Sequence, residues 1–289
     1  MAIRPFKLHR PRALDEALAL LDEHGDDASA IAGGTELLVA LKARVLHYDH
    51  LVDLKKVPGL RGVNAEADGP IVIGALSTHH QLANDPILLQ HLPAYARLSD
   101  HIANIRVRCA GTLGGNLCFA EPHADPPALL CALGAEVVLE RAGARRRMRM
   151  EDFITGDFTT GREDGELLTH IEIPRPVAGA SYAYEKFGHL ERPAVSVAAG
   201  CRPTAAGLEF DIWVGAVAGR PLRLASVEDA IAGAPAEEAA ALARSAAEDA
   251  VGDIEAQDDL HGSADYKRHL AAVLAGRMVE RALRQQPQP

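Results

Sequence analysis

Strand-like and helix-like patterns of apolar residues alternate in the first part of the chain. Apolar residues recur at helical spacing over residues 13–24, and short apolar runs at 28–32 and 51–54 flank a helix-like segment at 36–44. Gly25 follows the first segment, at a position where glycine commonly ends a helix. We therefore expect a small βαβ lobe in which a glycine-containing turn precedes the second helix.

A second lobe is predicted to follow, and it begins with a hairpin. Strand-like runs at 60–66 and 71–76 are separated by Asp68-Gly69-Pro70, a combination typical of turns. Ser77-Thr78 then offers an N-cap for a short helix, and Asp85-Pro86 marks the start of another helix. The pattern thus indicates a hairpin followed by short helices.

Arginines are concentrated in one strand-like run of this second lobe. A helix-like segment at 128–133 is followed by strand-like runs at 135–140 and 145–150, with Gly143 in the turn between them. The four arginines between 145 and 149 suggest a nucleotide or nucleic-acid patch. The net charge of -10 instead favours an edge strand whose charged side chains alternate.

Prolines on both sides of Arg175 predict a boundary between two domains. We expect a first domain at 1–175, with lobes at about 1–55 and 56–175, and a C-terminal α+β domain at 176–289. The apolar patterns of the C-terminal domain predict three strands and then two helices, at 181–187, 195–201, 208–217, 235–251 and 263–283.

Composition narrows the class of protein. With 289 residues, of which 48% are hydrophobic, the chain can bury two or three cores. Its acidic balance argues against a nucleic-acid or anionic-membrane partner. The N-terminus shows no signal peptide, and no apolar run is long enough to span a membrane, so we expect a cytoplasmic protein. Four cysteines do not form a disulfide framework, which agrees with a reducing compartment.

Two glycine-rich segments carry the strongest chemical signal. Gly111, Gly114 and Gly115 lie within five residues, and an earlier Gly33-Gly34 pair stands between a strand-like run and a helix-like run. Glycine permits positive φ and close approach of the backbone to a ligand, and converging amides suit phosphate oxygens. Neither segment matches a P-loop or a GxGxxG motif. Together they predict a diphosphate held from two sides.

Other catalytic and metal motifs have little support. The chain contains no GxSxG, HExxH or Cys-x-x-Cys motif, so hydrolysis by an activated nucleophile and zinc chemistry are disfavoured. The adjacent His79 and His80 would point to different sides of a helix. A second candidate group fits no zinc or iron–sulfur spacing and is better explained by small buried thiols: Cys118, His123, Asp125 and Cys131. The chemistry must therefore come from a cofactor.

The two glycine segments, with later motifs, resemble the FAD subunit of molybdenum hydroxylases, the medium subunit of the xanthine dehydrogenase and aerobic carbon monoxide dehydrogenase family. The resemblance covers nearly the whole chain. It rests on these motifs: Ala32-Gly33-Gly34-Thr35-Glu36-Leu37, Gly111-Thr112-Leu113-Gly114-Gly115-Asn116-Leu117, Pro122-x-x-Asp125, Asp152-Phe153, GELLTHIEIP (165–174), YEKFGHLERPAVSVA (184–198) and Asp265-Tyr266-Lys267-Arg268.

The resemblance implies a fold, a cofactor and partners. The fold would be α+β, with a two-lobed FAD-binding domain of the PCMH or vanillyl-alcohol-oxidase-like type and a C-terminal domain of a small antiparallel sheet with helices. FAD would pass electrons from [2Fe-2S] clusters of a small subunit to NAD, a quinone or another acceptor. Molybdopterin would lie in a large subunit, with a dimer of heterotrimers as the assembly. We expect no iron–sulfur centre in this chain.

The resemblance also implies site residues. Residues 32–37 would hold the diphosphate and ribityl part of FAD, and residues 112–116 the other side of the diphosphate. Asp125 would accept a hydrogen bond from a ribose hydroxyl, Leu168 would pack near the isoalloxazine, and Lys186 would lie near its pyrimidine edge. No catalytic or metal residue is expected. The cofactor-binding residues are therefore predicted to be Ala32, Gly33, Gly34, Thr35, Glu36, Leu37, Gly111, Thr112, Leu113, Gly114, Gly115, Asn116, Asp125, Leu168 and Lys186.

One position departs from the family pattern. The family usually has Arg-Asn before the second glycine segment, whereas this chain has Arg108-Cys109, which removes an amide that could brace the turn. Glu36, an acid beside the expected diphosphate, would have to point away, cap the helix or meet a flavin hydroxyl. Two further functions stay open: a free-standing FAD oxidoreductase, and a non-catalytic assembly protein with the same fold.

Overall fold

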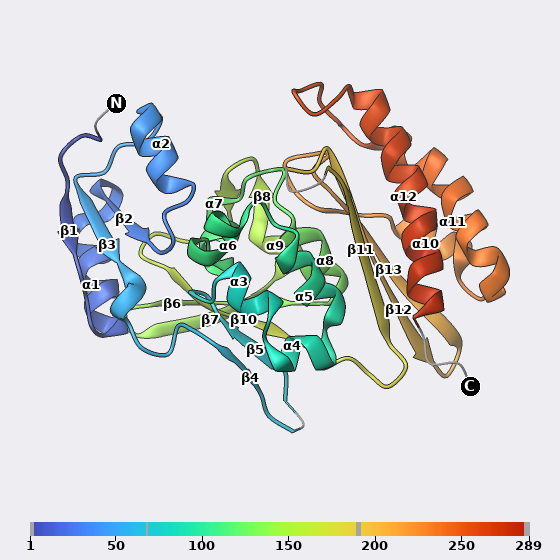
Figure 1. Ribbon diagram of the computed structural model, residues 1–289, viewed down its shortest axis with the longest axis horizontal. Helices are drawn as coiled ribbons and strands as arrows, with labels where there is room; N and C mark the ends of the chain where they lie inside the picture. The colour runs from blue at the N-terminus through green and yellow to red at the C-terminus, as the bar shows by residue number, and fades with distance from the viewer. Residues whose placement is uncertain (1–2, 68, 189–191, 286–289) are drawn as a thin grey trace.

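Three larger β-sheets lie side by side along the longest axis of the computed structural model, which describes residues 3–67, 69–188 and 192–285 (Figure 1). The N-terminal lobe is a parallel sheet of order β1-β3-β2. Its elements are β1 (Lys7–His9), α1 (Leu14–His24), β2 (Ala28–Ile31), α2 (Leu37–Ala43) and β3 (His50–Asp53). The predicted βαβ lobe is present, and β1 extends it by one strand.

The middle lobe is an antiparallel sheet of order β4-β5-β10-β6-β7, with helices packed against it (Figure 1). Its strands are β4 (Val63–Ala65), β5 (Ile71–Gly74), β6 (Glu136–Arg141), β7 (Ala144–Arg149) and β10 (Leu167–Ile173). The predicted hairpin joins β4 to β5, and Asp68 of its turn lies outside the described residues. The helices and a small hairpin are α3 (His79–Ala83), α4 (Pro86–His91), α5 (Pro93–Asp100), α6 (Ile105–Ala110), α7 (Leu113–Phe119), α8 (Pro126–Ala132), α9 (Met150–Phe153), β8 (Ile154–Gly156) and β9 (Thr159–Thr160).

The C-terminal part is an antiparallel sheet of order β11-β12-β13-β14 with helices on one face (Figure 1). Its elements are β11 (Ser181–Phe187), β12 (Val195–Thr204), β13 (Gly207–Gly215), β14 (Leu222–Arg223), α10 (Ala225–Ile231), α11 (Ala236–Ala250) and α12 (Ala264–Arg284). This arrangement confirms the α+β class.

The C-terminal sheet is covered on both faces. Val197 and Ile212 belong to the core formed with α11 and α12, whereas Ala198 and Trp213 belong to the core of the middle lobe. Because neighbouring residues of a strand point to opposite faces, the two sets alternate along β12 and β13. One face is covered by α11 and α12, and packing against α8 covers the other.

The arginine-rich run is an edge strand, as predicted. β7 is the last strand of the middle sheet, and its arginines pair with nearby glutamates. Arg146 makes a bidentate contact with the buried Glu166, at 2.6 Å and 2.7 Å. These ion pairs with glutamates of the same chain offset the positive charge of the arginine-rich run.

The second glycine segment differs from its predicted form. Gly114 and Gly115 lie in α7, and neither they nor Gly111 has a positive φ. Their small size serves packing instead: a Cβ on Gly114 would lie 2.6 Å from the Ala75 Cβ.

No helix within the described residues is both long and apolar enough to cross a membrane.

Candidate functional site

The two glycine segments lie against each other, backbone to backbone. A Cβ built on Gly33 would come within 2.0 Å of the carbonyl oxygen of Ala110 and 2.9 Å of the Gly111 Cα. A Cβ on Gly111 would in turn lie 3.4 Å from the Thr35 Oγ1. The contact brings the N-terminal lobe onto α6 and α7 of the middle lobe. Only glycine at position 33 permits this approach.

The first segment offers a row of open backbone amides. It runs from the end of β2 to the start of α2, with Gly34 at a φ of 72°. Among the described residues, no partner is assigned to the amides of Gly33, Gly34, Thr35 and Glu36. Unpaired amides at such a turn can hydrogen-bond the oxygens of an anionic ligand.

Most backbone amides of the second segment are already hydrogen-bonded to acceptors within the protein. Leu113 donates to the Ser77 carbonyl at 3.0 Å, and Gly114 donates to the Ala75 carbonyl at 2.8 Å. The Thr112 hydroxyl caps α7 by accepting from the Gly115 amide at 3.2 Å. The expectation that both turns present amides to a diphosphate is therefore corrected for 113–115: these residues fix α7 against the middle sheet.

A buried side-chain oxygen of α7 lacks a hydrogen-bond partner. The Oδ1 atom of Asn116 is buried and has no partner within the described part of the chain. An unsatisfied buried oxygen is costly unless a bound group supplies a donor. Asn116 therefore favours a ligand next to α7.

Leu168, another predicted site residue, lies on β10, is 5% exposed and belongs to the core of the middle lobe.

Asp125, Tyr184 and Lys186 form a buried polar group. The Tyr184 hydroxyl donates to Asp125 Oδ1 at 2.8 Å, and the Lys186 ammonium lies 3.0 Å from the same oxygen and 3.1 Å from Oδ2. Burial raises the pKa of Asp125, and the Lys186 ammonium and the Tyr184 hydroxyl act against that rise. Burial and the charge of Asp125 raise the pKa of Tyr184 well above its usual value.

An arginine of the C-terminal part bridges both lobes. Arg192 contacts Glu36 at 3.0 Å and Glu121 at 3.5 Å. Glu36 thus points toward Arg192, and its negative charge beside the open amides is offset. Arg192 was within a motif of the sequence, but only the fold reveals its two partners.

A second polar chain continues from Glu121 into the C-terminal part. Glu121 accepts from the backbone amide of His123 at 3.0 Å, and the His123 ring lies 2.9 Å from Asp259. Asp259 accepts from the buried Lys267 at 2.5 Å. Burial alone would raise the pKa of Asp259, but Lys267, the His261 amide and His123 together lower it to about 2. The network fastens the loop that carries Asp125.

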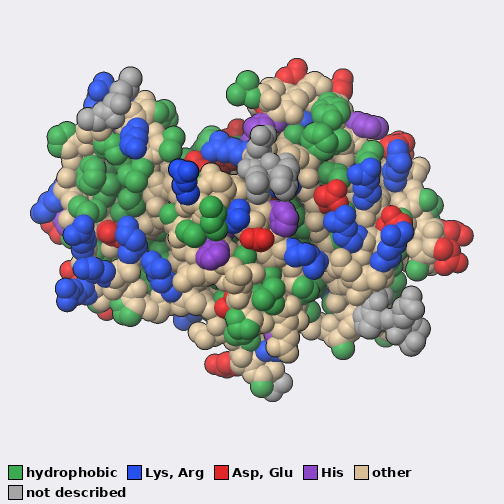
Figure 2. Space-filling view, in the orientation of Figure 1, with side chains coloured by type: hydrophobic (Ala, Val, Ile, Leu, Met, Phe, Trp, Pro, Cys, Tyr) green, Lys and Arg blue, Asp and Glu red, His purple; other side chains and the backbone are tan. Residues whose placement is uncertain are grey.

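The surface is hollowed between the N-terminal lobe and the C-terminal helices, above the middle lobe (Figure 2). α2 lies on one side of this hollow, and α6 and α7 lie at its base (Figure 1). The open amides at the start of α2 are therefore placed where a ligand could reach them.

Family models match both parts of the chain. The FAD binding domain in molybdopterin dehydrogenase matches residues 4–176, and the CO dehydrogenase flavoprotein C-terminal domain matches residues 191–282. The chain belongs to the FAD-binding medium subunits of the molybdenum hydroxylase family. FAD is its cofactor, and it is an FAD-dependent oxidoreductase subunit.

Individual relatives of this medium subunit agree with the family models. The chain is 35% identical over 284 residues to the carbon monoxide dehydrogenase medium chain of Hydrogenophaga pseudoflava, covering 96% of each chain. Its structure matches reconstituted CO dehydrogenase from Oligotropha carboxidovorans with a TM-score of 0.91 and 33% identity, covering 99% of this chain and 100% of that one. It also matches quinoline 2-oxidoreductase from Pseudomonas putida 86, at 0.89 and 30%, covering 98% and 99%.

The residues of this medium subunit fit FAD at two points. The open amides of 33–36 are donors suited to diphosphate oxygens, and Asn116 has an acceptor that lacks a protein partner. When bound, FAD supplies the capacity to take up and release electrons. Cys109, which stands where the family usually has asparagine, is exposed on α6.

The predicted list of site residues left out part of this geometry. Tyr184 was not singled out, although it stands two residues before Lys186 on β11, and such residues share one face of a strand. That spacing was the available signal. No comparable signal marks Asp259, which lies 136 residues from His123 and reaches it only through the fold.

A buried histidine beside the glycine contact predicts a pH-dependent stability. His79 is 2% exposed, and burial, followed by the charge of Arg108, lowers its pKa to about 4. Between pH 6.5 and 4 the unfolded chain binds a proton that the native chain excludes. The contribution of neutral His79 to the free energy of unfolding is fully present above about pH 6.5. Below that pH it falls by up to about 1.4 kcal/mol per pH unit.

His79→Gln should therefore flatten the stability profile. We expect the loss of unfolding free energy between pH 7 and pH 5 to shrink by about 2 kcal/mol, measured by denaturant titration. The exposed His80, next in sequence, serves as the control, and His80→Gln should keep the wild-type slope. An unchanged slope in His79→Gln would show that His79 is not held neutral.

Proposed function

We propose that this chain is the electron-transferring FAD subunit of a heterotrimeric molybdenum hydroxylase. It would receive electrons from iron–sulfur clusters of a small subunit and deliver them to an external acceptor such as NAD or a quinone. A large molybdenum-cofactor subunit would complete the heterotrimer, and two heterotrimers would form the assembly. The relatives called medium chains and FAD-subunit support this proposal.

The contact between the two glycine segments is the observation that carries the proposal. Gly33 touches the backbone of Ala110, so the open amides of 33–36 are fixed beside the start of α7. In this proposal those amides bind the diphosphate, and residues 32–37 and 111–116 line it together. A fixed row of donors lowers the entropy lost on binding.

The buried polar group of Asp125, Tyr184 and Lys186 has a positioning role in the same proposal. Asp125 would hydrogen-bond a ribose hydroxyl, because a carboxylate can accept more bonds than the two it makes with Tyr184 and Lys186. Lys186 would place positive charge near the pyrimidine edge of the flavin, and Leu168 would pack near the isoalloxazine. The first domain, residues 1–175, would thus hold most of the cofactor, and residues 176–289 would supply Lys186.

The test uses the purified full chain, first with FAD and then with candidate electron donors. Retained flavin absorption that anaerobic NADH bleaches supports electron transfer with a nicotinamide. Flavin that NADH does not reduce, but that a quinone reoxidises after chemical reduction, supports a quinone. Failure to retain FAD would overturn the proposal and favour the assembly protein. Oxidation of an organic substrate by the chain alone would favour a free-standing oxidoreductase.

A further inference from the structure

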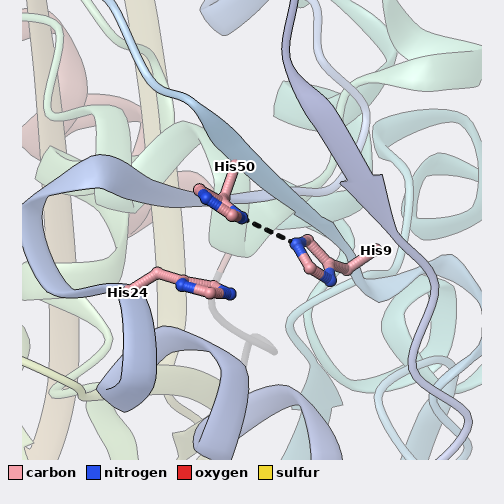
Figure 3. Close-up of side chains that lie close together, drawn as sticks. All are labelled: His9, His24 and His50. Carbon is pink, nitrogen blue, oxygen red and sulfur yellow. Dashed lines mark hydrogen bonds between the residues drawn. The ribbon is translucent and has the colours of Figure 1, made fainter.

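Three histidines converge in the N-terminal lobe, outside the flavin site. His9 lies on β1, His24 is the last residue of α1, and His50 is the first residue of β3 (Figure 3). One ring nitrogen from each lies within 4.8 Å of the others. His9 Nε2 and His50 Nδ1 are 2.9 Å apart, and the His24 ring stacks on the His50 ring with centroids 3.7 Å apart.

The fold places these rings on one face of the sheet. His9 is opposite Val52 in the parallel pairing of β1 with β3, and His50 stands two residues before Val52, so all three side chains share a face. Val52 packs in the same core as Ala17 of α1, which identifies this face as the one that α1 covers. The end of α1 then brings His24 to the two strand histidines.

The three rings offer ligands of one kind. Imidazole nitrogen suits zinc, nickel and copper, whereas magnesium and calcium prefer oxygen. Tetrahedral coordination at about 2.0–2.1 Å would separate the nitrogens by about 3.3 Å, so their separations would have to shorten by at most about 1.5 Å. The stacked His24 and His50 rings would also have to turn so that their nitrogens face one point. All three residues are half-buried, so water can reach the rings.

The charges around the three rings are mixed, and Lys7 affects the His9 ring more strongly than Glu23 does. The carbonyl end of α1, which carries a partial negative charge, lies at His24. Glu23 is near enough to His9 to interact with it electrostatically. The Lys7 ammonium opposes this, but its side chain is exposed and can extend into water.

We propose that His9, His24 and His50 form a binding site for a divalent transition-metal ion of the zinc class. The site links β1, α1 and β3 of the N-terminal lobe. It lies toward the opposite end of the strands from the first glycine segment: His50 pairs with Ala28, at the start of β2, and the glycine turn follows the end of β2. The three residue steps from the start to the end of β2 span about 10 Å.

Zinc binding to the full chain, prepared without a polyhistidine tag, tests the proposal. Equilibrium dialysis against zinc chloride followed by metal analysis should find one zinc per chain. His24→Gln and His50→Gln should each weaken binding at least tenfold. His80→Gln, which removes an exposed histidine of α3, should bind zinc as the wild type does. Cobalt in place of zinc should give the intense visible bands of a tetrahedral site in the wild type and in His80→Gln, but not in His24→Gln or His50→Gln.

Thermal unfolding gives a second readout that does not depend on the variants. Zinc should raise the unfolding temperature of the wild type, because a ligand of the native state stabilises it, and magnesium should not. Absence of stoichiometric zinc in the wild type, or equal binding by His24→Gln and wild type, would overturn the proposal. Flavin retention is measured in the same samples and is expected to stay unchanged, so the result is independent of the FAD site.

Discussion

Gly33→Ala is expected to weaken FAD binding about a hundredfold, which corresponds to about 2.7 kcal/mol. The added Cβ would lie 2.0 Å from the Ala110 carbonyl oxygen and 2.7 Å from its carbonyl carbon. Both neighbours are backbone atoms, so no side-chain rotation can relieve the overlap. The N-terminal lobe must instead move away from α6, and the open amides of 33–36 move with it. Overpacking of this kind also costs about 1–3 kcal/mol of stability.

FAD titration followed by flavin fluorescence measures the effect, and thermal unfolding of the apoprotein measures the structural part. Gly156→Ala is the matched control, because a Cβ there meets nothing within 4 Å and its φ is not in the left-handed region. The control should bind FAD as the wild type does. Wild-type affinity in Gly33→Ala would mean that the two glycine segments need not touch for FAD to bind.

Lys186→Met should destabilise the protein by about 3–5 kcal/mol, because it leaves a buried carboxylate without its positive partner. Asp125 is 6% exposed, and the side chain of Lys186 is 7% exposed. Tyr184 would still donate to Asp125, but one neutral hydrogen bond does not replace an ion pair. Denaturant unfolding of the apoprotein measures this loss without FAD.

A second substitution separates the ion pair from the shape of the lysine. In the double variant Lys186→Met, Asp125→Asn, the buried charge is gone and Tyr184 can still donate to the amide oxygen, so part of the stability should return. Lys42→Met, at an exposed lysine of α2, should change stability by less than about 0.5 kcal/mol. Equal destabilisation in the single and double variants would show that the lost packing, not the carboxylate, dominates.

The C-terminal part does more than cover the cofactor domain. It supplies Lys186 to Asp125, Arg192 to Glu36 and Glu121, and Asp259 to His123. Each of these contacts joins residues at least 60 positions apart in sequence, as in the pair of Asp125 and Lys186, which are 61 apart. The site therefore depends on the docking of all three sheets.

Local patterns in the sequence predicted much of the fold. β11 occupies 181–187 as expected, and α12 and β2 differ from their predicted bounds by only one residue. Period and turn chemistry are local properties, so they can be recognised without the fold. The glycine motifs pointed to the cofactor for the same reason, since each is a short contiguous run that resembles a motif of the FAD subunits.

Long-range packing decided what those patterns could not. The sequence alone identified the glycine segments, Asp125 and Lys186, but gave no means of pairing Asp125 with Lys186 or Arg192 with Glu36. It treated 111–116 as a second amide turn, whereas Ser77 and Ala75 take the amides of Leu113 and Gly114 in the folded chain. Partners distant in sequence are chosen by how the sheets dock, and only the tertiary structure fixes that docking.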